Sequence, residues 1–238
     1  MKISGIEKLS LVDFDGYVSS TIFTGGCNFK CPFCHNAILV EKHEEIPEYS
    51  KKEIFDFLRK RQGIIEAVCI SGGEPTLQKD LPQFCEEIKT LGYKIKLDTN
   101  GTNFETVKSL YQNGLIDYLA VDIKNDKQNY NRTIGKDFDL TNVEKTVDFL
   151  INNNIYYEFR TTLVKEYHKK ENMLNIACWI KGAKKYFLQK FKDSENCISR
   201  GLSPVDEETA NEFLHLLREF IPNTFLRGYD NAIEENKK

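Results

Sequence analysis

The sequence has no long hydrophobic run, since none of its apolar stretches approaches the ~18 residues of a membrane-spanning helix. The first apolar stretch is broken by Glu7, Lys8, Asp13 and Asp15, so it lacks the uninterrupted core of a signal peptide. Basic residues are not in excess either, because the net charge is −3 and the pI is 5.9. We therefore expect a cytoplasmic protein that binds neither nucleic acid nor membrane.

The chain also lacks internal repeats and low-complexity linkers. Hydrophobic residues make up 40% of the 238 residues, with 16 Phe and 11 Tyr, which is enough apolar material for a sizeable core. Disorder is therefore not expected over most of the chain. The charged tail at residues 234–238 is the exception, and we expect it to be frayed.

Strand-like and helix-like segments alternate along the chain. Ser50 and Asp80 are suited to cap helices, and Gly92 is suited to close the helix that begins at Asp80. Six strands that alternate with helices predict an α/β fold with a parallel sheet and outer helical crossovers. The predicted strands are 18–23, 67–70, 94–97, 118–123, 155–163 and 185–188, and the other predicted helices are 50–62, 104–112, 141–152, 171–180 and 206–220.

Unusual polar residues and cysteines cluster just after the predicted strands. They lie in residues 27–34, 72–74, 98–101 and 122–124. In parallel α/β folds, ligands bind at the carboxyl edge of the sheet. One edge of the sheet is therefore expected to carry the chemistry.

Three of the seven cysteines, Cys27, Cys31 and Cys34, fall within eight residues. In a reducing compartment such a group indicates metal binding rather than disulfides. Three thiolates on one loop can each bind one iron of a [4Fe–4S] cubane and leave the fourth iron open, whereas most electron-transfer clusters have four cysteine ligands. The alternative is zinc with His35 or His43 as fourth ligand, although zinc ligands usually come as two separated pairs.

The C-x3-C-x2-C spacing, with Phe33 before the third cysteine, resembles the defining motif of the radical S-adenosylmethionine (SAM) superfamily. Residues 71–75, Ser-Gly-Gly-Glu-Pro, resemble the superfamily's glycine-rich motif. This resemblance implies that Gly72, Gly73 and Glu74 hold the methionine amino group of SAM, because glycine permits close backbone approach and glutamate accepts from an ammonium. It also implies a [4Fe–4S] cluster on the three cysteines and a partial (β/α)6 barrel in a single domain, residues 1–233.

Further motifs resemble those of the glycyl-radical-enzyme activating proteins. They are Phe-Thr-Gly-Gly-Cys at 23–27, Cys-His-Asn at 34–36, Asp-Thr-Asn-Gly at 98–101 and Asp-Ile-Lys at 122–124. The resemblance implies that further residues bind the cofactors: Phe33 and Asn36, then Asp98, Thr99 and Asp122 around a monovalent cation beside the SAM carboxylate, and Lys124 and Arg160 as SAM contacts.

Simpler interpretations of these residues stay open. Asp98, Asp122 and Lys124 could instead be ordinary strand-end residues. The partner of Arg160 could be a ligand carboxylate or an internal Asp or Glu. His35 adjoins the last cysteine, and a donor there could tune the cluster's potential.

Residues 5–14, the cysteine segment and residues 186–191 are most similar to activating proteins of anaerobic ribonucleoside-triphosphate reductase. This similarity implies reductive cleavage of SAM, a glycyl radical made on that reductase, and a flavodoxin or ferredoxin-type electron donor. Three alternatives remain. The chain could activate another glycyl radical enzyme, act on a small molecule, or be an iron–sulfur electron-transfer or structural metal protein.

The remaining cysteines and histidines carry no motif. Cys69, Cys85 and Cys178 lie in apolar patterns and are expected to be buried, whereas Cys197 lies in a polar loop and is a candidate for exposure. The three histidines outside the cysteine segment are expected to be ordinary surface or core residues: His43, His168 and His215.

Overall fold

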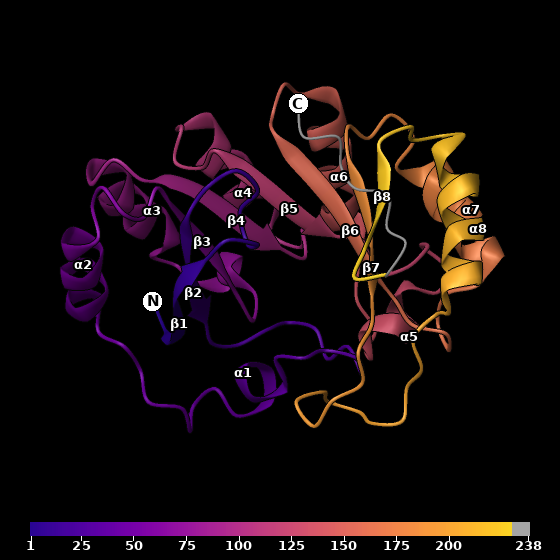
Figure 1. Cartoon of the computed structure of the whole chain (residues 1–238), viewed down its shortest axis with the longest axis horizontal. Coiled ribbons are helices and arrows are strands. Elements are labelled where there is room, and N and C mark those ends of the chain that lie inside the picture. Colours follow the sequence, from indigo (N-terminus) through magenta and orange to yellow (C-terminus); the bar gives the residue numbers. More distant parts are fainter. Residues whose placement is uncertain (230–238) are drawn as a thin grey trace. The chain divides into compact units, whose positions relative to one another are not determined.

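The computed structural model describes residues 1–229, so the expected frayed tail at 234–238 lies outside the described residues. Strands and helices alternate along the chain, and the order of the strands within the sheet, from β1 to β8, is the same as their order in the chain (Figure 1). The chain divides into two compact units, which are described in turn. The first comprises Met1–Asn28, Asn36–Ala120 and Asn154–Tyr156, and the second comprises Phe29–His35, Val121–Asn153 and the described residues from Tyr157 onward.

The first unit contains parallel strands with one antiparallel strand at the edge. β2 pairs in parallel with β3, and β3 with β4, whereas β1 runs antiparallel to β2. The strand interiors are buried, which is typical of a parallel sheet covered by helices. The elements are β1 (Ile3–Ser10), β2 (Ser19–Thr24), α1 (Ala37–Glu41), α2 (Lys51–Lys60), β3 (Ala67–Gly72), η1 (Pro75–Leu77), α3 (Leu81–Thr90), β4 (Lys94–Thr99) and α4 (Phe104–Gln112).

The helix starts predicted in this unit are confirmed, although only one has the expected cap. Ser50 forms a capping box with Glu53 at the start of α2. Asp80 precedes α3, but its side chain makes no cap hydrogen bond. It instead binds the terminal ammonium of Met1 at 2.6 Å and Lys51 at 2.7 Å.

The second unit also contains a parallel sheet. β6 pairs in parallel with β7, and β7 with β8, while helices α7 and α8 pack against each other. Strand β5 (Tyr118–Asp122) begins in the first unit and ends in the second. The other elements are α5 (Tyr130–Ile134), α6 (Thr141–Asn152), β6 (Tyr157–Leu163), α7 (Lys170–Trp179), β7 (Tyr186–Lys190), α8 (Glu207–Arg218) and β8 (Thr224–Arg227).

All six predicted strands are present, but the count of six was too low. The structure adds β1 as an antiparallel edge strand and β8 as a four-residue strand after the last helix. The sequence of β1 lacks a clear alternation of apolar and polar residues, and β8 is too short to show one. The one-turn helices α1 and α5 were missed because five residues are too few to show a helical period.

Two expectations about cysteines were wrong. Cys178 is exposed although its helix is largely apolar, and Cys197 is buried although its loop is polar. Cys69 and Cys85 are buried as predicted. Local pattern thus identified the cysteine inside strand β3 and the one on the amphipathic helix α3, but not the one on the solvent side of α7 or the one in a loop.

Within residues 1–229 the structure has no helix that combines the length and the apolar character of a membrane span.

Candidate functional site

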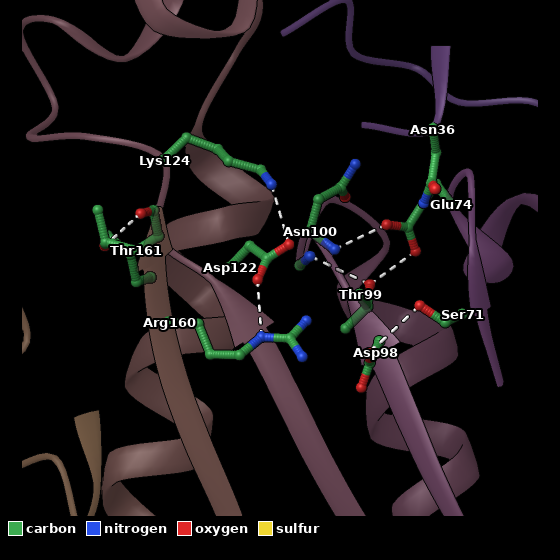
Figure 2. A network of polar contacts seen from close by, with 12 residues as sticks. Asn36, Ser71, Glu74, Asp98, Thr99, Asn100, Asp122, Lys124, Arg160 and Thr161 are labelled. Carbon is green, nitrogen blue, oxygen red and sulfur yellow. Dashed lines mark hydrogen bonds and ion pairs between the residues drawn. The ribbon is translucent and has the colours of Figure 1, made fainter. Parts of the chain in front are cut away.

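Glu74, directly after β3, is a buried carboxylate with only 1% of its surface exposed. It accepts hydrogen bonds from the Thr76 amide at 3.1 Å and hydroxyl at 2.5 Å. It also accepts from the Thr99 hydroxyl at 2.6 Å and the Asn100 amide at 2.7 Å (Figure 2). These four donors are neutral. Burial raises the pKa of Glu74 in spite of them. Because neutral donors do not cancel the negative charge of the Glu74 carboxylate, a cationic ligand group would compensate it.

Gly72 and Gly73 let the end of β3 pack closely on the end of β2 and on the residues that follow it. Gly72 has a φ of +113°, and a Cβ there would lie 2.5 Å from the backbone of Thr24. A Cβ on Gly73 would lie 2.0 Å from the carbonyl oxygen of Gly26, the residue before Cys27. Glycine is therefore required here by packing between two loops, in addition to any approach to a ligand.

Polar side chains at this edge of the first unit contact one another. The Asn36 amide donates to the Gly72 carbonyl at 3.0 Å. The Ser71 hydroxyl donates to the Asp98 carboxylate at 3.2 Å (Figure 2). Lys96 lies 3.8 Å from the same carboxylate. The structure thus brings together five residues that the sequence predicted to bind the cofactors, namely Asn36, Gly72, Gly73, Glu74 and Thr99, and it surrounds Asp98 with further polar groups.

Asp122, at the end of β5 in the second unit, is paired with two cations. Arg160 Nε and Lys124 Nζ each lie 2.9 Å from its carboxylate (Figure 2). Burial acts to raise the pKa of Asp122, but the two cations outweigh it and hold the pKa at about 2. Burial acts to lower the pKa of Lys124, and Asp122 raises it overall. The trio carries a net positive charge and is suited to bind an anionic group.

The contacts of Arg160 therefore agree with the simpler interpretation, an internal carboxylate partner. This ion pair uses the Nε of the guanidinium group.

His168 supports the backbone that carries Lys124. Its Nδ1 accepts from the Val164 amide at 2.9 Å, so its Nε2 carries the proton and donates to the Lys124 carbonyl at 2.9 Å. Burial lowers the pKa of His168 to about 4. The Thr161 hydroxyl donates to the Ile123 carbonyl at 2.6 Å. His168 was expected to be an ordinary core or surface residue, and nothing in its sequence neighbourhood indicates this contact.

The cysteine segment is divided between the units, with Cys27 in the first and both Cys31 and Cys34 in the second. Burial raises the pKa of the Cys31 thiol to about 11, and the charge of Lys124 opposes the increase. A cation beside this thiol suits a negatively charged cluster. Within residues 1–229 the structure forms no group of three or more His, Cys, Asp or Glu side chains placed to hold a metal ion. Cluster ligation by these cysteines therefore stays a prediction.

Phe33 and His35, which neighbour these cysteines, both contact residues of the second unit. Phe33 is buried, with its ring 6.0 Å from that of Tyr167 and 6.5 Å from that of Phe191. The Nε2 of His35 lies 2.6 Å from the Lys192 carbonyl. Both side chains thus contact the second unit's own residues in this structure, and the cofactor-binding role of Phe33 stays a prediction.

The model of the radical SAM superfamily matches residues 21–175, more than half of the chain. The chain therefore belongs to the radical SAM superfamily, and it is an enzyme of that class. Membership implies a [4Fe–4S] cluster and SAM, and the thiols, the glycine-rich loop and Glu74 are chemically suited to them.

A more specific relative extends over the whole chain. The sequence is 34% identical over 242 residues, covering 98% of both chains, to "Putative glycyl-radical enzyme activating enzyme MJ1227" of Methanocaldococcus jannaschii.

Solved structures support the fold. The crystal structure of Streptococcus suis SuiB bound to SAM is similar with a TM-score of 0.67 and 15% identity, over 86% of this chain and 49% of that one. A domain of pyruvate-formate lyase-activating enzyme from Bacteroides vulgatus has a TM-score of 0.57 and 18% identity, over 68% of this chain and 99% of that one. At these identities the likeness shows the α/β fold, with its mostly parallel sheet and outer helices.

Proposed function

We propose that this chain is a glycyl-radical-enzyme activating enzyme, which cleaves SAM reductively and generates a glycyl radical on a partner enzyme. The observation that carries the proposal is Glu74, a buried carboxylate of the glycine-rich motif whose four donors are all neutral. Similarity over 98% of the chain to the Methanocaldococcus jannaschii protein supports the same function.

The proposal gives each predicted residue a role. Cys27, Cys31 and Cys34 hold the cluster, which supplies the electron for cleavage of the SAM C–S bond when it is bound. Glu74 accepts from the methionine ammonium. Lys124 and Arg160, with Asp122 between them, attract the carboxylate. The other predicted residues keep the cofactor-binding role that the resemblance implies: Phe33, Asn36, Gly72, Gly73, Asp98 and Thr99.

The proposal does not include the predicted monovalent cation. Asp122 already has two cationic partners, and the Thr99 hydroxyl donates a hydrogen bond to Glu74. A third cation beside Asp122 would be repelled by Lys124 and Arg160. The residues predicted to coordinate it are therefore assigned to positioning and charge balance.

The cluster assignment is tested by anaerobic reconstitution, which should give about four irons per chain. Alanine at any one of the three cysteines should abolish the intact cluster. Cys178→Ala is the matched control, because Cys178 is an exposed cysteine on the outer helix α7. Stoichiometric zinc in protein purified anaerobically, without iron uptake on reconstitution, would contradict the assignment and favour a structural metal protein.

We further propose anaerobic ribonucleoside-triphosphate reductase as the partner and a flavodoxin or ferredoxin-type protein as the electron donor, on the basis of the motif similarity. Reduced enzyme, SAM and the reductase of the source genome should give a doublet glycyl signal by electron paramagnetic resonance. Deuterium on the target glycine Cα should appear in 5′-deoxyadenosine. If 5′-deoxyadenosine forms without the doublet, the partner is wrong. If no SAM is cleaved by fully loaded enzyme, the activity itself is wrong.

A further inference from the structure

The segment after β7, residues 191–199, is hydrogen-bonded to the cysteine segment. The Ser199 amide donates to the Pro32 carbonyl at 2.7 Å, and the Ile198 amide donates to the Cys34 carbonyl at 3.2 Å. These bonds satisfy two carbonyls of a loop that forms neither helix nor strand. We call residues 191–199 the cover segment.

Aromatic side chains hold the beginning of the cover segment. The ring of Phe191 is 1% exposed and stacks on the ring of His35, with centroids 5.4 Å apart and planes at 30°. Its ring also meets Phe33 edge-on at 6.5 Å. His35 is exposed, so water competes for its bond to the Lys192 carbonyl. Phe191 is therefore the main anchor, and His35 is the weaker one.

The cover segment has an internal contact, and the cysteine segment has a second restraint outside the cover segment. Cys197 is buried, with its sulfur 3.7 Å from the Ser194 hydroxyl. The cysteine segment is fixed elsewhere by the bond from the Lys30 amide to the Ile134 carbonyl at 3.0 Å. At Gly135 a Cβ would lie 2.5 Å from the Lys30 carbonyl oxygen. The loop that carries Cys31 and Cys34 is thus restrained by α5 and by the cover segment.

We propose that the cover segment shields the iron–sulfur cluster. It excludes water and dioxygen from the Pro32–Cys34 part of the cysteine loop and fixes the positions of Cys31 and Cys34. Phe191 and His35 are its positioning residues. Solvent exposure and the shell around the ligands set both the potential and the lifetime of such clusters. This inference rests on the proposed ligation by the three cysteines.

The first test uses full-length protein without the cluster and measures hydrogen exchange of the Ile198 and Ser199 amides. Phe191→Leu should speed exchange about tenfold, because it loosens the main anchor. His35→Phe, which keeps a ring but removes the donor, should speed it roughly threefold, and His35→Gln, which keeps a donor, should restore protection. His215→Gln, an exposed histidine of α8, is the control. Unchanged exchange in Phe191→Leu would overturn the proposal.

The second test uses reconstituted protein. The loss of cluster absorbance in air should be several-fold faster in Phe191→Leu than in wild type, by about the same factor as amide exchange. The cluster's reduction potential should shift in the same variant and stay unchanged in His215→Gln. Faster amide exchange with an unchanged lifetime and potential would make the segment merely structural and overturn the shielding role. Wild-type protein that takes up no iron would overturn the proposed ligation and this role together. If the wild type binds the cluster and Phe191→Leu has the same cluster lifetime and potential, this role alone is overturned.

Discussion

Glu74 and Asp122 are both carboxylates at strand ends, but their surroundings give them opposite properties. Glu74, in the first unit, accepts from four neutral donors, and burial raises its pKa. Asp122, in the second, is held by Arg160 and Lys124, which lower its pKa to about 2. One group is left with an uncompensated negative charge, and the other is part of a net positive trio.

This difference shows that the partner, rather than the residue type, decides what a carboxylate can do. Neutral hydrogen bonds orient Glu74 without cancelling its charge, so it is suited to receive an ammonium. Asp122 is already neutralised, so under the proposed function it holds Lys124 and Arg160 in place for an anion. Under the proposed function, SAM has one group of each kind, an ammonium and a carboxylate.

The largest effect is expected from Asp122→Asn, which leaves two part-buried cations without their carboxylate. The free energy of unfolding should fall by about 2–3 kcal/mol, measured by urea denaturation, and SAM cleavage should be lost. Asp148→Asn, on helix α6, is the control because this aspartate is exposed. If Asp122→Asn keeps both stability and SAM cleavage, the trio has no role in either.

Glu74→Gln should separate charge from packing in the first unit. The amide retains the shape and one acceptor oxygen, so the cluster should still form. SAM affinity should fall roughly 10- to 150-fold, because one charge-assisted hydrogen bond is lost. Titration calorimetry on reconstituted protein measures the change, with Glu86→Gln on the exposed face of α3 as control. Wild-type affinity in Glu74→Gln would assign this residue to loop structure only.

A fall in pH should lower the stability that His168 contributes in the second unit and reduce the penalty that Glu74 imposes in the first. His168 has a pKa lowered from 6.5 to about 4, so its contribution to stability is present above pH 6.5 and is lost as pH falls through that range. The wild-type free energy of unfolding should drop by about 2 kcal/mol between about pH 7 and pH 5 through this residue. Glu74 has a raised pKa, so its penalty is present at neutral pH and declines as the pH falls through that pKa.

The pH effect is measured by urea unfolding at both pH values. His168→Gln should lose most of the drop, whereas His215→Gln should retain it, since His215 is exposed on α8. An identical pH dependence in His168→Gln and wild type would show that His168 does not stay neutral in the folded protein.

The smallest effect is expected from Ser71→Ala, which removes the hydroxyl that donates to Asp98 at 3.2 Å. Such a neutral-donor bond is worth about 0.5–1 kcal/mol, so SAM affinity should fall roughly two- to fivefold. Ser109→Ala, on the exposed side of α4, is the control. A loss as large as that of Glu74→Gln would mean that Asp98, and not Glu74, supplies the main contact.

The fold was predictable wherever local signals were strong. The six strands followed from short apolar runs, and α4 and α6 were predicted with the bounds that the structure has. β1 and β8 were missed, because an edge strand and a four-residue strand bury too little to leave a pattern. Cys178 and Cys197 were misjudged because burial depends on which side of a helix faces the core and on how a loop folds, and neither followed from the local sequence.

The sequence by itself determined the class of chemistry. The cysteine spacing and the glycine-rich motif are local features, and the end of a parallel strand is a ligand-binding position whatever follows it. Only the tertiary structure decided the partners: the four neutral donors of Glu74, the two cations of Asp122, the contact of His168 with the Lys124 carbonyl, and the cover segment on the cysteine loop. Apart from the bonds from Thr76 to Glu74 and from Lys124 to Asp122, each of these contacts joins residues far apart in the chain. Electrostatic energy depends on distance in space and on burial, which sequence spacing does not give.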